Sequence, residues 1–203
     1  MKLFVEGGGD SKSMRAECRK GFRQFLENAG IKGKMPKIIA SGSRHSAYED
    51  YCRAIANSGS ALLLVDSEEP VIDKHQTGDA SQWQPWHHLE GQQGSSWSRP
   101  AHGSDMDCHL MVQCMESWIV ADHKNLESYF GGTLKANALP APGSPVETVP
   151  KNDLLQGLKV ATAKCKKGQY NKGKHSFNLL GETNPDRVAE ASPWAKRLMD
   201  RLR

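Results

Sequence analysis

Acidic side chains follow apolar runs at three places in the chain. Glu6 comes directly after the apolar residues 3–5, and Asp10 follows it across three glycines. Asp66 and Glu68 follow the apolar run 61–65, and Glu116 follows a further apolar run. Carboxylates packed together raise one another's pKa, and a divalent cation removes that cost. These residues therefore predict a site for Mg²⁺ or Mn²⁺, which take oxygen ligands, rather than for zinc with its His and Cys ligands.

The elements that must position these acids alternate along the first part of the chain. Short apolar runs at 3–5, 37–40 and 61–65 predict strands, and helical patterns cover residues 11–29 and about 44–55. A fourth strand is predicted over 108–115, and a helix or turn over 116–122. This order predicts an α/β fold with a mainly parallel sheet flanked by helices. The carboxyl ends of parallel strands share one edge, where ligands bind in such sheets, so the acids should meet there.

The glycines at 7–9 lie between the first two acids. Glycine accepts backbone angles closed to other residues, so the chain can turn sharply beside Glu6. Asp10 then falls where the first helix should begin, and two interpretations stay open for it. Its carboxylate either caps that helix or binds the metal.

Charge is distributed unevenly along the chain. Residues 1–150 have a balance of −3, whereas residues 151–203 have a balance of +7. This C-terminal part is predicted to be helical, with helices over about 152–167 and from Ser192-Pro193 onward. A basic surface beside an acidic body suits a metal site that acts on a polyanion, although a solvated basic face looks the same in sequence.

Nucleic acid is the polyanion that this pattern suggests. Five lysines would bind its phosphate backbone without recognising the base sequence: Lys164, Lys166, Lys167, Lys172 and Lys174. Tyr170 and His175 interleave with them and are candidates for stacking on bases. Arg44, at the head of the second helix, either grips a neighbouring phosphate or is an ordinary surface arginine.

Two stretches lack clear periodicity. Residues 69–107 are rich in Pro, Gly, Ser, Gln and His and predict a long loop insertion whose tryptophans pack onto the body. His87-His88 in it is expected to be a surface turn. Residues 131–150, rich in Pro and Gly, predict a linker.

Several classes of protein are disfavoured. No stretch is apolar enough to span a bilayer and no signal peptide is evident, so the cytoplasm is the expected location. The five cysteines form no Cys-x-x-Cys pair, which disfavours a disulfide framework. Residues 7–13 differ from a phosphate-binding loop because Ser11 replaces the glycine before Lys-Ser, and the dinucleotide-binding Gly-x-Gly-x-x-Gly is missing.

Four motifs carry a family resemblance: Val-Glu-Gly-Gly-Gly-Asp-Ser-Lys (5–12), Ser-Gly-Ser-Arg (41–44), Leu-Leu-Val-Asp-Ser-Glu (63–68) and Met-Glu-Ser-Trp-Ile-Val-Ala-Asp (115–122). An apolar strand ending in Glu-Gly-x-x-Asp, followed by one ending in Asp-x-Glu, resembles the Toprim domain of topoisomerases, primases and overcoming-lysogenization-defect (OLD) nucleases. Together the motifs are more similar to a bacterial Toprim-like family of unknown function, whose genes often neighbour an ATPase in anti-phage defence loci. The resemblance spans residues 1 to about 122 well and 170–202 more loosely.

The resemblance implies a role for each acid. Glu6 and Asp10 match the first Toprim motif, Asp66 and Glu68 the second, and Glu116 the further acid of the OLD branch. That branch also uses a downstream lysine, for which Lys172 and Lys174 are both candidates. Glu68 departs from the pattern, since many Toprim proteins have Asp there, and this could change the metal preference or geometry.

The expected organisation is then a Toprim-like catalytic domain over 1–130, a linker over 131–150 and a basic helical extension over 151–203 that packs on the core. The expected function is a Mg²⁺- or Mn²⁺-dependent nuclease, cutting DNA or RNA (tRNA included), as a defence effector with an ATPase partner. In a two-metal mechanism the acids hold ions on either side of the scissile phosphate. The alternative is a non-catalytic adaptor or sensor that binds an ATPase or nucleic acid, with the tryptophan-containing loop as its exposed docking surface.

Overall fold

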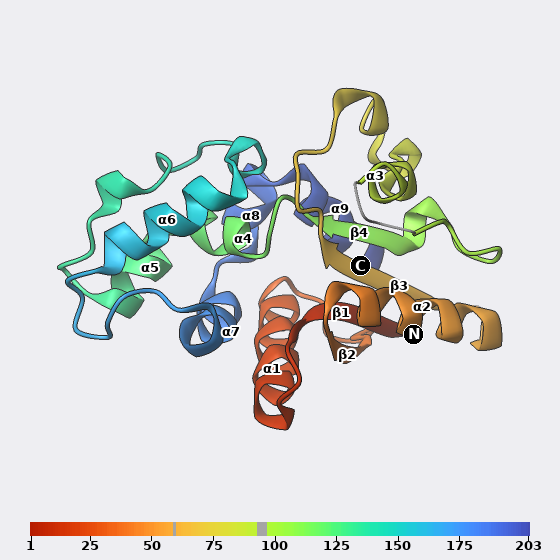
Figure 1. The fold of residues 1–203 in the computed structure, drawn as a ribbon, viewed down its shortest axis with the longest axis horizontal. Helices are drawn as coiled ribbons and strands as arrows, with labels where there is room; N and C mark the ends of the chain where they lie inside the picture. The colour runs from red at the N-terminus through yellow and green to blue at the C-terminus, as the bar shows by residue number, and fades with distance from the viewer. Residues whose placement is uncertain (59, 93–96) are drawn as a thin grey trace.

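A four-stranded parallel sheet forms the centre of the computed structural model, which describes residues 1–58, 60–92 and 97–203. Every adjacent strand pair is parallel, in the order β2-β1-β3-β4 (Figure 1). The strands are β1 (Lys2–Gly8), β2 (Lys37–Gly42), β3 (Ala61–Asp66) and β4 (Cys108–Met111). The predicted α/β fold class is confirmed.

Both faces of the sheet are covered, which explains the continuous apolar runs of its strands. Leu3 and Val5 belong to one hydrophobic cluster, whereas Phe4 between them belongs to another on the opposite face. In β3, Leu62 and Leu64 likewise belong to the first cluster and Leu63 to the second. The alternation follows from the period of two in strand side chains.

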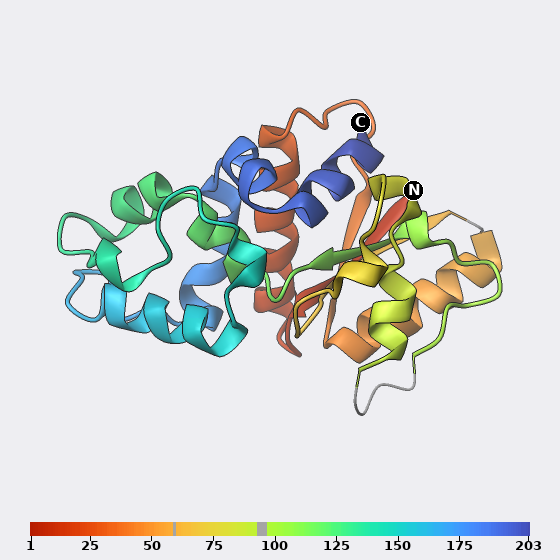
Figure 2. The same ribbon diagram turned by 90° about the horizontal axis from the view of Figure 1, so that it is seen from above.

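The first face carries the longest helix and most of the C-terminal half. Figures 1 and 2 place α5 and α6 on one side of the molecule and α2 and α3 on the other. Buried residues of α1 and of the C-terminal helices form one cluster with the sheet, so the basic segment shares its core. The helices are α1 (Lys12–Asn28), α2 (Arg44–Ser58), α3 (Pro85–Glu90), α4 (Glu116–Ala121), α5 (His123–Phe130), α6 (Lys151–Thr162), α7 (Lys172–Glu182), α8 (Pro185–Ala191) and α9 (Pro193–Leu202).

Some predicted boundaries were wrong. The N-cap of α1 is Ser11, whose side chain accepts a hydrogen bond from the Met14 amide, so Asp10 does not cap this helix. Strand β4 ends at Met111 rather than at residue 115, and α6 ends at Thr162 rather than at 167. The last helix begins at Pro193 with Ser192 as its N-cap, as predicted.

The stretch 69–107 is not a structureless loop. It contains α3 and short 3₁₀ turns at 73–75, 80–82 and 105–107, while residues 93–96 lie outside the described residues. Trp86 and Trp97 are only 1% and 7% exposed, which confirms that tryptophans pack this stretch onto the body. The same burial contradicts the expectation of an exposed tryptophan surface. His88 is also buried, so the surface-turn prediction is wrong for it.

Residues 131–150 follow α5 and precede α6. They include 3₁₀ turns at 136–138 and 146–148, and Leu139 and Val146 are buried. The division into domain, linker and extension stays a prediction. Among the described residues, none of the helices combines the length and apolarity needed to cross a bilayer.

Replacing Gly8 with alanine is expected to destabilise the fold. Gly8 has φ +86°, and a Cβ there would lie 2.7 Å from the Cα of Arg15. Both the left-handed conformation and the contact with backbone oppose a side chain, so the loss should exceed about 1 kcal/mol. Thermal unfolding should then shift down by at least roughly 2–4 °C. Gly132→Ala is the matched control because its Cβ would meet open space, and equal midpoints for the two variants would contradict the prediction.

Candidate metal centre

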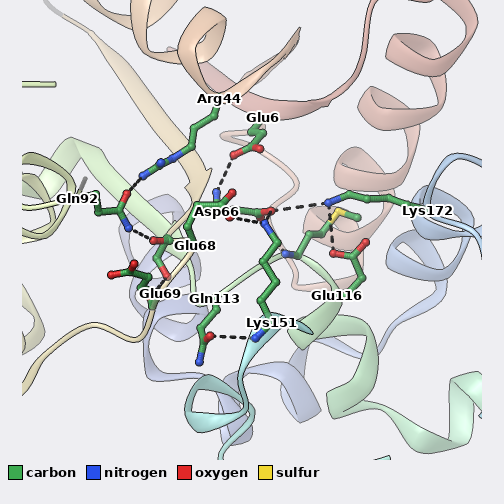
Figure 3. Close-up of polar contacts among 12 residues, drawn as sticks. Glu6, Arg44, Asp66, Glu68, Glu69, Gln92, Gln113, Glu116, Lys151 and Lys172 are labelled. Atoms are coloured by element: carbon green, nitrogen blue, oxygen red, sulfur yellow. Dashed lines mark hydrogen bonds and ion pairs between the residues drawn. The ribbon is translucent and has the colours of Figure 1, made fainter. Parts of the chain in front are cut away.

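Three carboxylates meet at the carboxyl edge of the sheet. Glu6 lies near the end of β1, Asp66 is the last residue of β3, and Glu68 follows two positions later. One carboxylate oxygen from each residue lies within 4.8 Å of the other two (Figure 3). We call Glu6, Asp66 and Glu68 the acidic triad. Oxygen ligands gathered from two neighbouring strands suit a hard divalent cation.

Backbone groups fix the positions of the triad. The Asp66 amide donates to Glu6 Oε2 at 3.0 Å, and the Met115 amide donates to Asp66 Oδ1 at 2.9 Å. Glu68 has φ +64°, and its amide donates to the Gln113 carbonyl oxygen at 2.9 Å. A glutamate in the left-handed region is strained, and such strain clusters at functional sites.

Burial makes ionisation of Glu6 and Asp66 costly. Burial first, and then the charge of Glu6, raises the pKa of Asp66 to about 8, against the opposing effect of Lys172. Burial also raises the pKa of Glu6, although the hydrogen bond from the Asp66 amide opposes this. A divalent cation would relieve both effects, so the donor set fits a hard divalent cation.

Two lysines already contact these acids. Lys151 Nζ lies 2.6 Å from Glu68 Oε2 and 3.7 Å from Asp66 Oδ2. Lys172 Nζ lies 3.8 Å from Asp66 Oδ2 and 3.4 Å from Glu116 Oε2. Burial lowers the pKa of both lysines, but the carboxylates outweigh it and raise the pKa overall. The site therefore places two ammonium groups directly against its carboxylates.

Glu116 lies beside the triad rather than within it. It is the first residue of α4, is fully buried, and accepts a hydrogen bond from the Tyr170 hydroxyl at 2.9 Å. With this bond and the Lys172 contact, both of its oxygens have partners. Tyr170 and His175 are buried, and His175 Nδ1 accepts from the Asn171 amide, so the expectation that they stack on bases is wrong.

Asp10 does not join the triad. Its side chain is fully exposed, and its nearest ion-pair partner is Arg15, with Nη2 at 3.9 Å from Oδ1. The backbone turns through three glycines with positive φ between Glu6 and Asp10, as expected, and this turn carries Asp10 away into solvent.

The basic residues separate into two groups. Lys172 reaches the acids, whereas Lys174 Nζ donates to the Lys167 carbonyl oxygen at 3.3 Å. Lys174 is therefore the wrong candidate for the lysine at the centre. Lys164, Lys166 and Lys167 lie exposed between α6 and α7, and Lys167 Nζ is 3.6 Å from the Tyr129 ring centroid.

Arg44 belongs to a second layer of contacts around the triad. Its guanidinium carbon lies 4.7 Å from the Trp97 ring centroid, and it donates to the Gln92 side chain. Gln92 donates in turn to the carbonyl oxygen of Ser67, and His88 Nε2 lies 3.1 Å from the same oxygen. Because Ser67 separates Asp66 from Glu68, Gln92 and His88 support the triad from outside (Figure 3).

Sequence reasoning missed Lys151, Gln92 and Gln113. Gln113 Oε1 accepts from the Lys151 amide at 3.0 Å and so holds the start of α6 near Glu68. The one available signal was Pro150, which marks a helix start directly before Lys151. Nothing in the sequence links that helix to acids more than 80 positions earlier.

The fold and site define a parallel α/β protein with an acidic cluster at the carboxyl edge of its sheet. The chain belongs to the family described as domain of unknown function DUF4276, whose model matches residues 5–203. The matched range contains the triad, both site lysines and the C-terminal helices. Comparison with curated proteins and with solved structures finds no match.

Proposed function

We propose that the protein is a divalent-metal-dependent phosphodiesterase that cuts nucleic acid. The observation that carries the proposal is the triad itself: three carboxylates, with the pKa of Glu6 and Asp66 raised, lie against the ammonium groups of Lys151 and Lys172. Like charges accumulate in this way where a protein holds a cation or shifts a pKa for catalysis.

The residues divide the work between metal binding and charge stabilisation. Glu6, Asp66 and Glu68 would hold Mg²⁺ or Mn²⁺, which supplies Lewis-acid activation of a phosphate oxygen and of water. Lys172 lies at the edge of the triad with its side chain half exposed, so it can reach a phosphate oxygen. Glu116 contacts that ammonium group from the buried side, and the Tyr170 hydroxyl holds Glu116 by a hydrogen bond.

A more specific assignment, to a Toprim-type nuclease, extends the same proposal. The resemblance of the four motifs to Toprim and OLD-type nucleases agrees with the parallel sheet that carries the acids. The charge of +7 over residues 151–203 favours a polyanionic substrate, DNA or RNA. An ATPase partner and a role in anti-phage defence rest on that resemblance, whereas a cytoplasmic location rests on the lack of an apolar stretch or signal peptide in the sequence. The adaptor alternative loses its main support because Trp86 and Trp97 are buried rather than exposed for docking.

Cleavage assays with the purified protein test the proposal. Labelled DNA and RNA, incubated with Mg²⁺ or Mn²⁺, should be degraded, and EDTA should stop the reaction. Glu6→Gln should lower the rate by at least about tenfold because it removes a ligand and leaves the fold intact. Glu27→Gln, on the exposed face of α1, is the matched control and should cut normally. Cleavage that survives Glu6→Gln would show that another site, or a contaminant, performs it.

A further inference from the structure

A cavity of about 230 Å³ opens beside the acidic triad. Its charged lining consists of Glu6, Asp66 and Lys172, which already belong to the metal centre. The rest of its wall consists of glycines, at 7–9, 42 and 173, and of the apolar side chains Met14, Met115 and Phe177. The cavity therefore has one side formed by the charged residues of the metal centre and another side that carries no charge.

The size and chemistry of this cavity limit its occupant. Pockets for drug-sized ligands are typically ~300–1,000 Å³, so this cavity suits a single ring system rather than a longer segment. Glycine backbone and apolar side chains offer flat contact, with little to distinguish one base from another. A nucleobase inserted here would keep its own phosphodiester near Lys172 and the triad.

We propose that this cavity receives the base of the nucleotide whose phosphodiester is cut, so that the substrate is an unpaired strand. This inference rests on the proposed nuclease function and adds the form of nucleic acid that the site accepts. A base within a duplex is stacked and paired, and entering a cavity beside the triad would require unstacking and unpairing it. Single strands and frayed ends avoid that cost.

Gly173 offers a direct test because it also lines the cavity. A Cβ at this position would lie 3.7 Å from Met14 Cε and 3.5 Å from Asn171 Oδ1, which are ordinary contact distances. Gly173→Ala should therefore fold normally and take little space. Gly173→Leu should project further into the cavity and exclude a base. Gly33→Leu is the matched control, since a Cβ there meets open space in the turn before β2.

Binding can be measured apart from cleavage, by fluorescence anisotropy of a labelled oligonucleotide with Ca²⁺ in place of Mg²⁺. The wild-type protein should bind a short single strand at least about tenfold more tightly than the blunt duplex of the same sequence. A tenfold change in affinity corresponds to about 1.4 kcal/mol, which is within the range that the stacking of one base contributes. Gly173→Leu should remove that preference, while Gly33→Leu should keep it. A mononucleotide should compete only at much higher concentration than an unlabelled strand, and equal competition would assign the cavity to free nucleotides instead.

The two proposals fail in different ways. If Gly173→Leu folds but keeps the single-strand preference and the wild-type cleavage rate, the base pocket is wrong and the nuclease stands. If the wild-type protein does not cut nucleic acid, yet its strand preference is lost in Gly173→Leu, the pocket stands and the catalytic proposal is wrong. Equal binding of single strand and duplex by the wild-type protein would overturn the pocket as well.

Discussion

Replacing Asp66 with asparagine is expected to abolish metal-dependent cleavage while making the metal-free protein more stable. The loss of activity should reach at least about 100-fold because the proposal makes Asp66 one of three ligands of the cation. The gain in stability arises because asparagine keeps Oδ1 as acceptor for the Met115 amide but carries no charge beside Glu6. Lys151 and Lys172 retain Glu68 and Glu116 as partners.

The same substitution should change how stability depends on pH. Burial raises the pKa of Asp66 to about 8 in the folded protein, from its ordinary value of 3.8. Between these values the folded state keeps a proton that the unfolded chain has lost. The free energy of unfolding of the metal-free wild type should therefore fall as pH rises from about 4 to about 8. Asp66→Asn removes this titration, so its stability should fall less over that interval.

Thermal unfolding in EDTA at several pH values measures the effect. Near pH 7 the variant should gain at least about 1 kcal/mol, or roughly 2–4 °C. Mg²⁺ or Mn²⁺ should raise the midpoint of the wild type by ligand linkage and leave that of Asp66→Asn unchanged. Asp153→Asn, exposed on α6, serves as a control for the change of residue type. A less stable Asp66→Asn would mean that the carboxylate is structural rather than poised for a cation.

The triad could be predicted because its geometry depends mainly on two strand assignments. Once residues 3–5 and 61–65 are parallel strands of one sheet, their carboxyl ends share an edge wherever the helices pack. Glu6, Asp66 and Glu68 therefore meet for a reason that local sequence contains. The sheet pairing of β1 with β3 is the one long-range fact required.

The remaining site residues depend on packing that local patterns do not encode. Lys151 reaches Glu68 only because α6 folds back beside the sheet edge. Glu116 was expected at a strand end, but β4 stops early and the chain turns before α4 begins. In 69–107, α3 has six residues, too few for a helical period to show, so a folded segment looked like a loop.

Lys172→Met is expected to lower kcat by about 100-fold or more, whereas Lys174→Met should have almost no effect. A positioned cation or donor that stabilises charge developing on the reacting group is typically worth ~10²–10³ in kcat. Lys172 Nζ contacts Asp66 and Glu116, while Lys174 Nζ bonds to a backbone carbonyl oxygen away from the acids. Methionine keeps the unbranched stem in each case, so the pair of variants isolates the ammonium group.

Loss of Lys172 could also act through stability, because it leaves fully buried Glu116 with Tyr170 as its remaining partner. An unsatisfied buried group costs about 1–3 kcal/mol, more when charged. The double variant Lys172→Met/Glu116→Gln removes that charge and should recover the unfolding midpoint without recovering cleavage. If activity returned with stability, Lys172 would be a positioning residue for the fold and not a group that meets the phosphate. Recovery of the midpoint alone would assign its ammonium group to the chemistry.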